Sequence, residues 1–418
     1  MVFVDGLLAY LAAYAGAFAD VASLRPKVPA TRAETERAQG LAGRDSAPLS
    51  ARRLLFLLLF PLFIAFQIVN ALCLALDHLF FPGFRRVAVR RPVFVLGVPR
   101  SGTTFLHREL ARDARFNAPR TWELLLAPSL CQRFLISALA RIDALLGSPT
   151  ARLLAFLARG QIDSVSEVHP VAWQAAEEDY LALLACGGCF FMHLAFPSFR
   201  GFRDLSDLSR LDARRRERLL DHYHALLQRQ LYFHSGGQLL SKNAVFASWA
   251  PWLARRYPDA LILFCIREPA AALASQLNSL RDARRLFATF PEDRGLKDGF
   301  REHYRGWWQA LAASVEELDP TPLVIEQEYL KHNRDAVMDL IYRRLQRHAA
   351  ADNSASGCPG ENGQAQSPAA AADYPTSRGS PQASAVAAWE IGENDVAPML
   401  TAYGLLRSTA EHLREHGV

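Results

Sequence analysis

The segment RPVFVLGVPRSGTTFLHREL, residues 91–110, constrains the fold more than any other part of this sequence. Four apolar residues, Val93 to Leu96, run into a turn with glycine and proline, and a hydroxyl-rich stretch then opens a helical pattern. A strand, a GxxxxG loop and a helix in this order form a concave anion site from backbone N–H groups and the helix amino end. Nucleotide-binding loops of this kind place lysine after the second glycine. Here Thr103 occupies that position, and Arg100 supplies a cation three residues earlier.

Strand-like and helical patterns alternate after this unit. Further apolar runs lie at Leu261–Ile266 and Leu323–Ile325, and helical patterns lie at residues 216–234 and 336–348. Alternation of this kind favours a parallel sheet covered by helices. We therefore predict an α/β fold, with a P-loop-like central parallel sheet flanked by helices, over residues 85–348.

The residues before this domain carry a long apolar run. Leu54–Leu76 contains no charged residue, and only Gln67 and Asn70 are strongly polar. A helix of this length can cross the hydrocarbon core of a bilayer, and few soluble helices are apolar all round. We therefore predict that residues 1–84 form an apolar, helical, membrane-associated region.

Two further features bear on the topology of this region. A shorter apolar stretch, Leu7–Phe18, fits a second membrane-touching helix, and more arginines follow the long run than precede it. Under the positive-inside bias, this distribution places the following domain on the cytoplasmic side. The alternative is a buried hairpin of core helices, interrupted near Pro61.

The C-terminal part of the chain divides by composition. Residues 349–385 are rich in Ala, Ser, Gly and Pro, which predicts a disordered low-complexity segment. Residues 386–418 regain helical periodicity, and we expect them to dock back on the domain.

Composition excludes some classes of partner. In a chain of 418 residues, a formal net charge of +5 suits anionic ligands but is too small to indicate nucleic-acid binding. The six cysteines lie mostly in apolar runs, as free thiols do. Cys186 and Cys189, with His193 nearby, lack a second ligand pair at comparable spacing, so we predict no metal site.

A second block, residues 239–277, contains Arg267 at the end of a strand-like run and Ser275 eight residues later. A guanidinium can form two hydrogen bonds to a phosphate, and a hydroxyl on the next helix can donate another. Together with PRSGTTFLH, residues 99–107, this block resembles the sulfotransferases that use 3′-phosphoadenosine 5′-phosphosulfate (PAPS). Their 3′-phosphate motif has the same arginine–serine spacing, and their 5′-phosphosulfate loop reads much like residues 99–107.

The resemblance implies PAPS as co-substrate and a role for each motif residue. Arg267 and Ser275 would hold the 3′-phosphate. The 5′-phosphosulfate would be held by the loop residues Arg100, Ser101, Gly102, Thr103 and Thr104. Arginine at position 100 departs from the cytosolic sulfotransferases, which usually carry lysine there, and matches the protein-tyrosine and bacterial sulfotransferases instead.

Catalysis of sulfuryl transfer should depend mostly on positioning and cationic clamps, by analogy with phosphoryl transfer. The candidates are Arg100 and Lys242, because relatives place a lysine in a similar segment near the donor. The acceptor hydroxyl also needs a base. Glu123 is the first candidate, since a Trp-Glu pair after the first helix is typical of the bacterial relatives. The rival segment offers His169 and an acidic cluster. That cluster consists of Glu177, Glu178 and Asp179.

The sequence thus predicts in-line transfer of a sulfuryl group from PAPS to a hydroxyl or amine acceptor, without a metal. The acceptor can be a small molecule, a lipid or a glycan. Two alternatives stay open: a P-loop-type kinase or nucleotide hydrolase, and a membrane protein whose loop only binds an anion. The absence of lysine after Gly102 and the pairing of Arg267 with Ser275 argue against the kinase.

Overall fold

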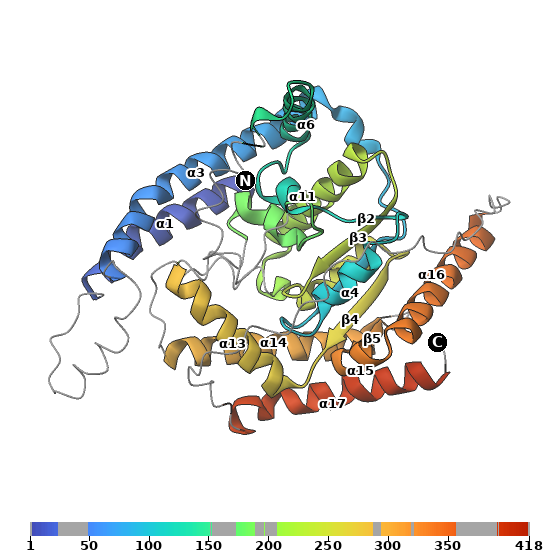
Figure 1. Ribbon diagram of the computed structural model, residues 1–418. Coiled ribbons are helices and arrows are strands. Elements are labelled where there is room, and N and C mark those ends of the chain that lie inside the picture. Colours follow the sequence, from blue (N-terminus) through green and yellow to red (C-terminus); the bar gives the residue numbers. More distant parts are fainter. Residues whose placement is uncertain are drawn as a thin grey trace, which may run out of the picture.

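A five-stranded parallel sheet forms the centre of the computed structural model (Figure 1). The structure describes residues 2–23, 49–150, 152, 173–188, 196, 207–286, 294–318, 322–356, 391 and 393–416. The strands, in the spatial order β2-β3-β1-β4-β5, are β1 (Val93–Gly97), β2 (Phe116–Asn117), β3 (Gln238–Asn243), β4 (Leu261–Ile266) and β5 (Leu323–Glu326). All neighbouring strands run parallel. The predicted α/β class and its three predicted strands are confirmed.

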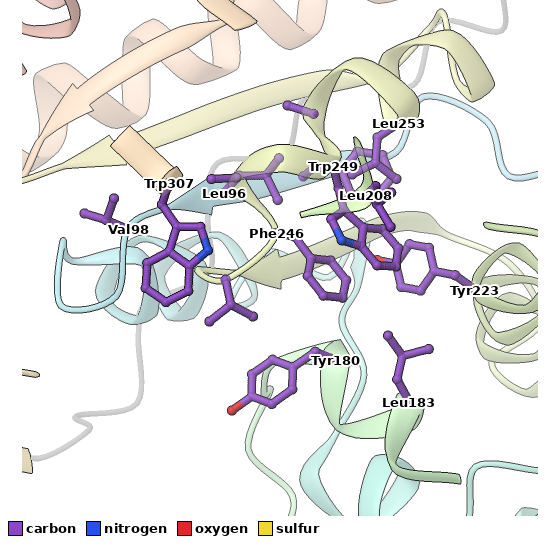
Figure 2. Packing of buried hydrophobic residues seen from close by; sticks show 14 of the residues in the cluster. Leu96, Val98, Tyr180, Leu183, Leu208, Tyr223, Phe246, Trp249, Leu253 and Trp307 are labelled. Atoms are coloured by element: carbon purple, nitrogen blue, oxygen red, sulfur yellow. The ribbon is translucent and has the colours of Figure 1, made fainter. Parts of the chain in front are cut away.

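Helices cover both faces of this sheet, because side chains of a strand alternate between the two faces. The helices of the body that contains this sheet are α4 (Thr103–Leu110), α5 (Thr121–Leu125), α6 (Leu130–Leu145), α11 (Ala213–Phe233), α12 (Ala250–Arg256), α13 (Pro269–Leu286), α14 (Arg294–Glu317), α15 (Gln327–His332), α16 (Arg334–Ser356) and α17 (Glu393–His416), with the 3-10 segments η1 (Pro82–Arg86) and η2 (Asp179–Cys186). Leu96 of β1 belongs to a cluster with Tyr223 of α11 and Trp307 of α14 (Figure 2). Its neighbour Val95 faces the other side, with Leu106 of α4 and Ile341 of α16.

The N-terminal region is built onto this body. Two helices, α1 (Val2–Ser23) and α3 (Leu49–Phe80), lie side by side along one edge of the molecule (Figure 1). Tyr10, Leu57 and Phe60 belong to the same buried cluster as Leu96 of β1. Helix α1 also approaches η2 so closely that a Cβ added at Gly6 would lie 2.4 Å from the carbonyl carbon of Cys186.

The long apolar run forms one unbroken helix. Helix α3 continues through Pro61, so the interruption of the hairpin alternative does not occur. Its segment Leu54–Phe80 is long and apolar enough to cross a membrane by length and composition alone, and 28% of the residues in its most apolar window are buried. Membrane association of this region therefore stays a prediction.

The C-terminal helix α17 packs against α14, α13 and β5. Met399 and Leu406 of α17 are fully buried in the main apolar cluster, as expected for a segment that docks back. Of the predicted low-complexity segment, residues 349–356 lie in the last turns of α16, and residues 357–385 lie outside the described residues.

Candidate active site

The loop between β1 and α4 has the backbone of an anion site. Arg100 and Gly102 both have left-handed backbone conformations, with φ of 68° and 89°. Alternation of left- and right-handed residues turns successive N–H groups toward one side, and the first N–H groups of a helix lack intrahelical acceptors. A side chain at Gly102 would also meet the Cγ of Gln327 at 3.0 Å. Ser101 is buried, and its hydroxyl donates to the Val98 carbonyl at 2.7 Å, which holds the turn closed.

The structure brings together the two separated motifs that the resemblance assigns to phosphate binding. Strands β1 and β4 are neighbours, with Gly97 paired to Cys265, so the loop after β1 lies beside the residues that follow β4. The Nε of Arg100 donates to the Ser275 hydroxyl at 3.0 Å. Arg267 donates from Nη1 to the Arg100 carbonyl at 3.4 Å. Arg100 is exposed, and Arg267 is partly exposed, so both guanidinium groups remain accessible to a ligand.

Lys242 reaches the same loop from the other neighbour of β1. It lies near the carboxyl end of β3, opposite Val95, and its side chain is only 2% exposed. The ammonium group donates to the Thr104 hydroxyl at 2.9 Å. Lys242 is therefore not a free surface lysine, and its side chain connects β3 to the first turn of α4.

Two members of the predicted acidic cluster contact this lysine. The Lys242 Nζ lies 2.9 Å from the nearer Glu178 oxygen and 3.5 Å from a Glu177 oxygen. An isolated antiparallel bridge between Arg120 and Ala176 positions this segment. Both carboxylates are partly exposed, at 32% for Glu177 and 18% for Glu178, so they remain accessible from solvent.

Asp179, the third member of the cluster, has a different environment. It is buried and accepts a hydrogen bond from the Tyr223 hydroxyl at 2.5 Å. Burial raises the pKa of its carboxyl to about 6, although the hydrogen bond from Tyr223 opposes this shift. The Tyr223 oxygen also lies 3.0 Å from the Ser241 hydroxyl, so Asp179 links η2 to α11 and β3.

Glu123 lies at the amino end of α5 with its carboxylate buried and fully engaged. One oxygen accepts from the Arg120 N–H at 2.9 Å and from Gln230 at 3.1 Å, and the other lies 2.7 Å from His234 Nε2. Burial alone would raise the pKa of this carboxyl, but the hydrogen bond from His234 and the charge of Arg133 outweigh burial and lower it.

These partners of Glu123 belong to the helix cap and the end of α11. Residues 230–234 precede β3, so they lie toward the amino ends of the strands, whereas Lys242 and the loop lie at the carboxyl ends. Among the described residues, no contact joins Glu123 to the loop, and its role as base stays a prediction.

The alternative base from sequence, and part of the cysteine–histidine group that we predict not to bind a metal, fall outside the described residues. His169 lies there, as do Cys189 and His193. Within the described part of the chain, no group of three or more His, Cys, Asp or Glu side chains could hold a metal ion.

A family model described as the sulfotransferase family matches residues 92–351. The chain belongs to the sulfotransferase family. Among solved structures, it is similar to the sulfotransferase STF1 from Mycobacterium tuberculosis H37Rv, at 20% identity and a TM-score of 0.52, over 70% of this chain and 77% of that one. The sulfotransferase STF9 from Mycobacterium avium also matches, at 18% identity and a TM-score of 0.47, over 69% of this chain and 73% of that one. No curated protein sequence matches the chain.

Two side chains that the sequence did not predict support the loop of this sulfotransferase. The buried Tyr304 of α14 donates from its hydroxyl to the Pro99 carbonyl at 2.8 Å. Gln327, at the start of α15, packs against Gly102. Neither residue belongs to a local motif, because each reaches the loop only through the packing of an element more than 200 positions away in the sequence.

Proposed function

We propose that this sulfotransferase transfers a sulfuryl group from PAPS to a hydroxyl or amine acceptor. The observation that carries the proposal is the contact between Arg100 and Ser275 at the carboxyl edge of the sheet. It joins the loop that the resemblance assigns to the 5′-phosphosulfate and the motif that it assigns to the 3′-phosphate. The family and the fold support sulfuryl transfer in general, and the donor and the mechanism are our inference.

The residues of the site fit a ligand with two anionic ends. Arg100 and Arg267 present two guanidinium groups, which form paired, charge-assisted hydrogen bonds to phosphate oxygens. Ser275 accepts from Arg100 and can donate its own proton to a phosphate. The loop between β1 and α4 contains no acidic residue, so nothing in it opposes an anion. The residues present therefore fit PAPS, with Arg100 and residues 101–104 toward its 5′ end.

PAPS, when bound, supplies a sulfuryl group whose bond to the 5′-phosphate oxygen breaks as the bond to the acceptor oxygen forms. Arg100 and Lys242 would stabilise negative charge on the departing oxygen, which is where fixed cations lower a barrier most. Thr104 holds the Lys242 ammonium at this position. No divalent metal enters this scheme.

The base should lie close to these cations. We infer that Glu178 takes the proton of the acceptor, because its carboxylate is partly exposed and lies 2.9 Å from Lys242. Glu123, the choice from sequence, is buried and holds three donors instead. His169 is the third possibility. A base within hydrogen-bond reach of the acceptor contributes roughly 10²–10⁴-fold to the rate, so substitution can separate the three.

The acceptor is proposed by class only. A small molecule, a lipid or a glycan with a free hydroxyl would suit a carboxylate base, and the apolar N-terminal helices favour an acceptor that is itself apolar or attached to lipid. We propose a membrane-associated location with the catalytic body on the cytoplasmic side.

The proposed donor is tested by calorimetry with 3′-phosphoadenosine 5′-phosphate and with ATP. We expect tight binding of the former and little affinity for ATP, whereas the kinase alternative requires the reverse. Arg267→Ala should weaken the bisphosphate at least about tenfold, because it removes a charge-assisted clamp of roughly 1.5–3 kcal/mol. The matched control is Arg407→Ala, an exposed arginine of α17 that pairs with Glu411. If both variants bind alike, Arg267 does not hold the 3′-phosphate.

A further inference from the structure

Helix α3 buries its polar side chains and exposes apolar ones. Gln67, Asn70 and Asp77 are buried, at 5%, 2% and 0% exposure, whereas Leu62 and Leu79 are 68% and 71% exposed. Every exposed residue between Leu54 and Leu76 is apolar. A helix at a water-facing surface shows the opposite arrangement, with its apolar stripe turned to the core. The outer side of α3 is therefore an apolar surface.

Helix α1 also exposes apolar side chains. We call the exposed large apolar residues of these two helices the α1–α3 face. It consists of Val4, Leu8 and Leu11 on α1 and of Leu54, Leu55, Leu58, Leu59, Leu62, Ile68, Val69, Leu72, Leu76, Leu79 and Phe80 on α3. Over the described residues, the only exposed large apolar side chains away from this face and from residues 134–146 at and after α6 are Phe105, Leu126, Trp173 and Leu400. Concentration of this degree marks an interaction surface.

The inner side of α3 is fixed to the body by polar contacts. The Asp77 carboxylate pairs with Arg229 of α11 at 2.7 Å and accepts from the Leu130 and Cys131 N–H groups at the start of α6. Asn70 accepts from Gln132 at 2.7 Å. If α3 crossed a bilayer, these partners would enter the hydrocarbon with it. Helix α11 carries the charged run Arg214–Arg218, and a charged side chain at the bilayer centre is very costly.

We propose that the protein is monotopic: the α1–α3 face enters one leaflet of an anionic bilayer, and α3 does not cross it. The apolar segment Leu54–Phe80 has 27 residues and spans about 40 Å, which exceeds the hydrocarbon thickness of about 30 Å and suits a helix that lies along the surface. The arrangement resolves how a helix long enough to span a membrane can also be part of the catalytic body.

Lipid fits this face better than a second protein surface. A protein interface has a polar rim with hydrogen bonds, and the exposed positions of Leu54–Leu76 offer none. Arg85, Arg86 and Arg90 are exposed just beyond the end of α3, where they meet phosphate headgroups. Basic residues beside an apolar face strengthen binding to anionic lipid.

Binding is tested by flotation of the full-length chain with vesicles of phosphatidylcholine alone and with added phosphatidylglycerol. We expect flotation that increases with the anionic lipid. Leu62→Glu should lower the bound fraction at least tenfold, and the matched control Leu400→Glu, at an exposed leucine of α17, should leave it unchanged. Circular dichroism and the unfolding midpoint show whether each variant is folded, independently of donor binding. A wild-type chain that stays unbound and dimerises through Leu62 would overturn the proposal, because a second copy then covers the face.

Topology is tested with a fluorophore at each end of α3, introduced at Leu55→Cys and at Leu79→Cys, both exposed positions. The wild-type chain gives the background from native cysteines. Bound to vesicles, both fluorophores should be quenched equally by dithionite added outside, because a monotopic helix keeps both ends in the outer leaflet. Protection of one end alone would show that α3 crosses the bilayer and would contradict the proposal.

Discussion

The carboxyl edge of the sheet and helix α3 both bury charged groups, but with different partners. At the sheet edge, Lys242 contacts Thr104 and the partly exposed Glu177 and Glu178, so its neighbourhood stays open to a ligand. In α3, Asp77 and Arg229 are 0% and 2% exposed and satisfy one another. A buried charge that is fully paired serves the fold, whereas one beside exposed partners can act on a substrate. The difference therefore distinguishes ionic groups that hold the fold from those that are candidates for catalysis.

The largest change in turnover is expected when carboxylates near the site are removed one at a time. Glu178→Gln should lower turnover by about 10²–10⁴-fold, since it removes the proposed base and keeps the side-chain shape. Glu123→Gln should cost turnover much less, because its carboxylate caps α5 and holds Gln230 and His234. Turnover is measured on one common acceptor, with affinity for the bisphosphate product measured alongside.

His169→Ala is the third arm of this experiment. If Glu123→Gln is inactive and Glu178→Gln is near wild type, the base is the one predicted from the sequence, and the burial of Glu123 is relieved when substrates bind. If only His169→Ala is inactive, the base belongs to the segment outside the described residues. Donor affinity should survive in Glu178→Gln and Glu123→Gln, because among the described residues neither carboxylate contacts Arg100, Arg267 or Ser275.

The second test removes the buried ion pair between Asp77 of α3 and Arg229 of α11. Asp77→Ala leaves Arg229 buried without its partner and removes the acceptor of two N–H groups, so it should destabilise the chain by about 3–5 kcal/mol. The matched control is Asp221→Ala, whose carboxylate pairs with Arg256 at 2.6 Å but is 66% exposed. That loss should be about 0–1 kcal/mol. Denaturant unfolding measures both, and similar losses would mean that α3 is not held through Asp77.

The contacts between α3 and the rest of the chain also limit what removal of the N-terminal helices can show. A chain starting near Arg85 lacks the partner of Arg229 and the inner side of α3, including Leu57 and Phe60. We therefore expect the shortened chain to unfold or aggregate, whatever its affinity for membranes. Surface substitutions in the full-length chain are the sound test of membrane binding.

The sequence predicted the parts of the fold that depend on local pattern. Strands β1, β4 and β5 were visible as apolar runs, and helices α11 and α16 as periodic ones. Strands β2 and β3 were not predicted. The two residues of β2 form a strand only through their pairing with Gln238 and Leu239, and β3 contains Ser241, Lys242 and Asn243, which are atypical of buried strands.

In the candidate site, too, contacts between local motifs could be predicted from the sequence and long-range contacts could not. The contact between Arg100 and Ser275 could be expected, because both motifs have fixed spacings next to a strand end. The contact between Glu178 and Lys242 could not, since it depends on the pairing of Arg120 with Ala176, 56 positions apart, and no periodicity records that pairing. The partners of Glu123 are likewise long-range: Gln230 and His234 follow it by more than 100 residues.

The smallest expected effect concerns His107 of α4, which is fully buried. Burial and the charge of Lys242 lower the pKa of its ring to about 3, below the ordinary value of about 6.5 in an unfolded chain. The unfolded state therefore binds one more proton at intermediate pH, and stability falls as pH decreases from about 6.5 toward 3. Between pH 7.5 and 5.5 this residue alone should lower the free energy of unfolding by about 1.4 kcal/mol.

In His107→Leu that share of the pH dependence of stability should vanish, while the shares of His222 and Asp179 remain in both proteins. Urea unfolding at the two pH values measures the difference. Equal pH dependence would mean that His107 binds protons alike in the folded and unfolded chains, so that its ring becomes charged beside Lys242 as pH falls.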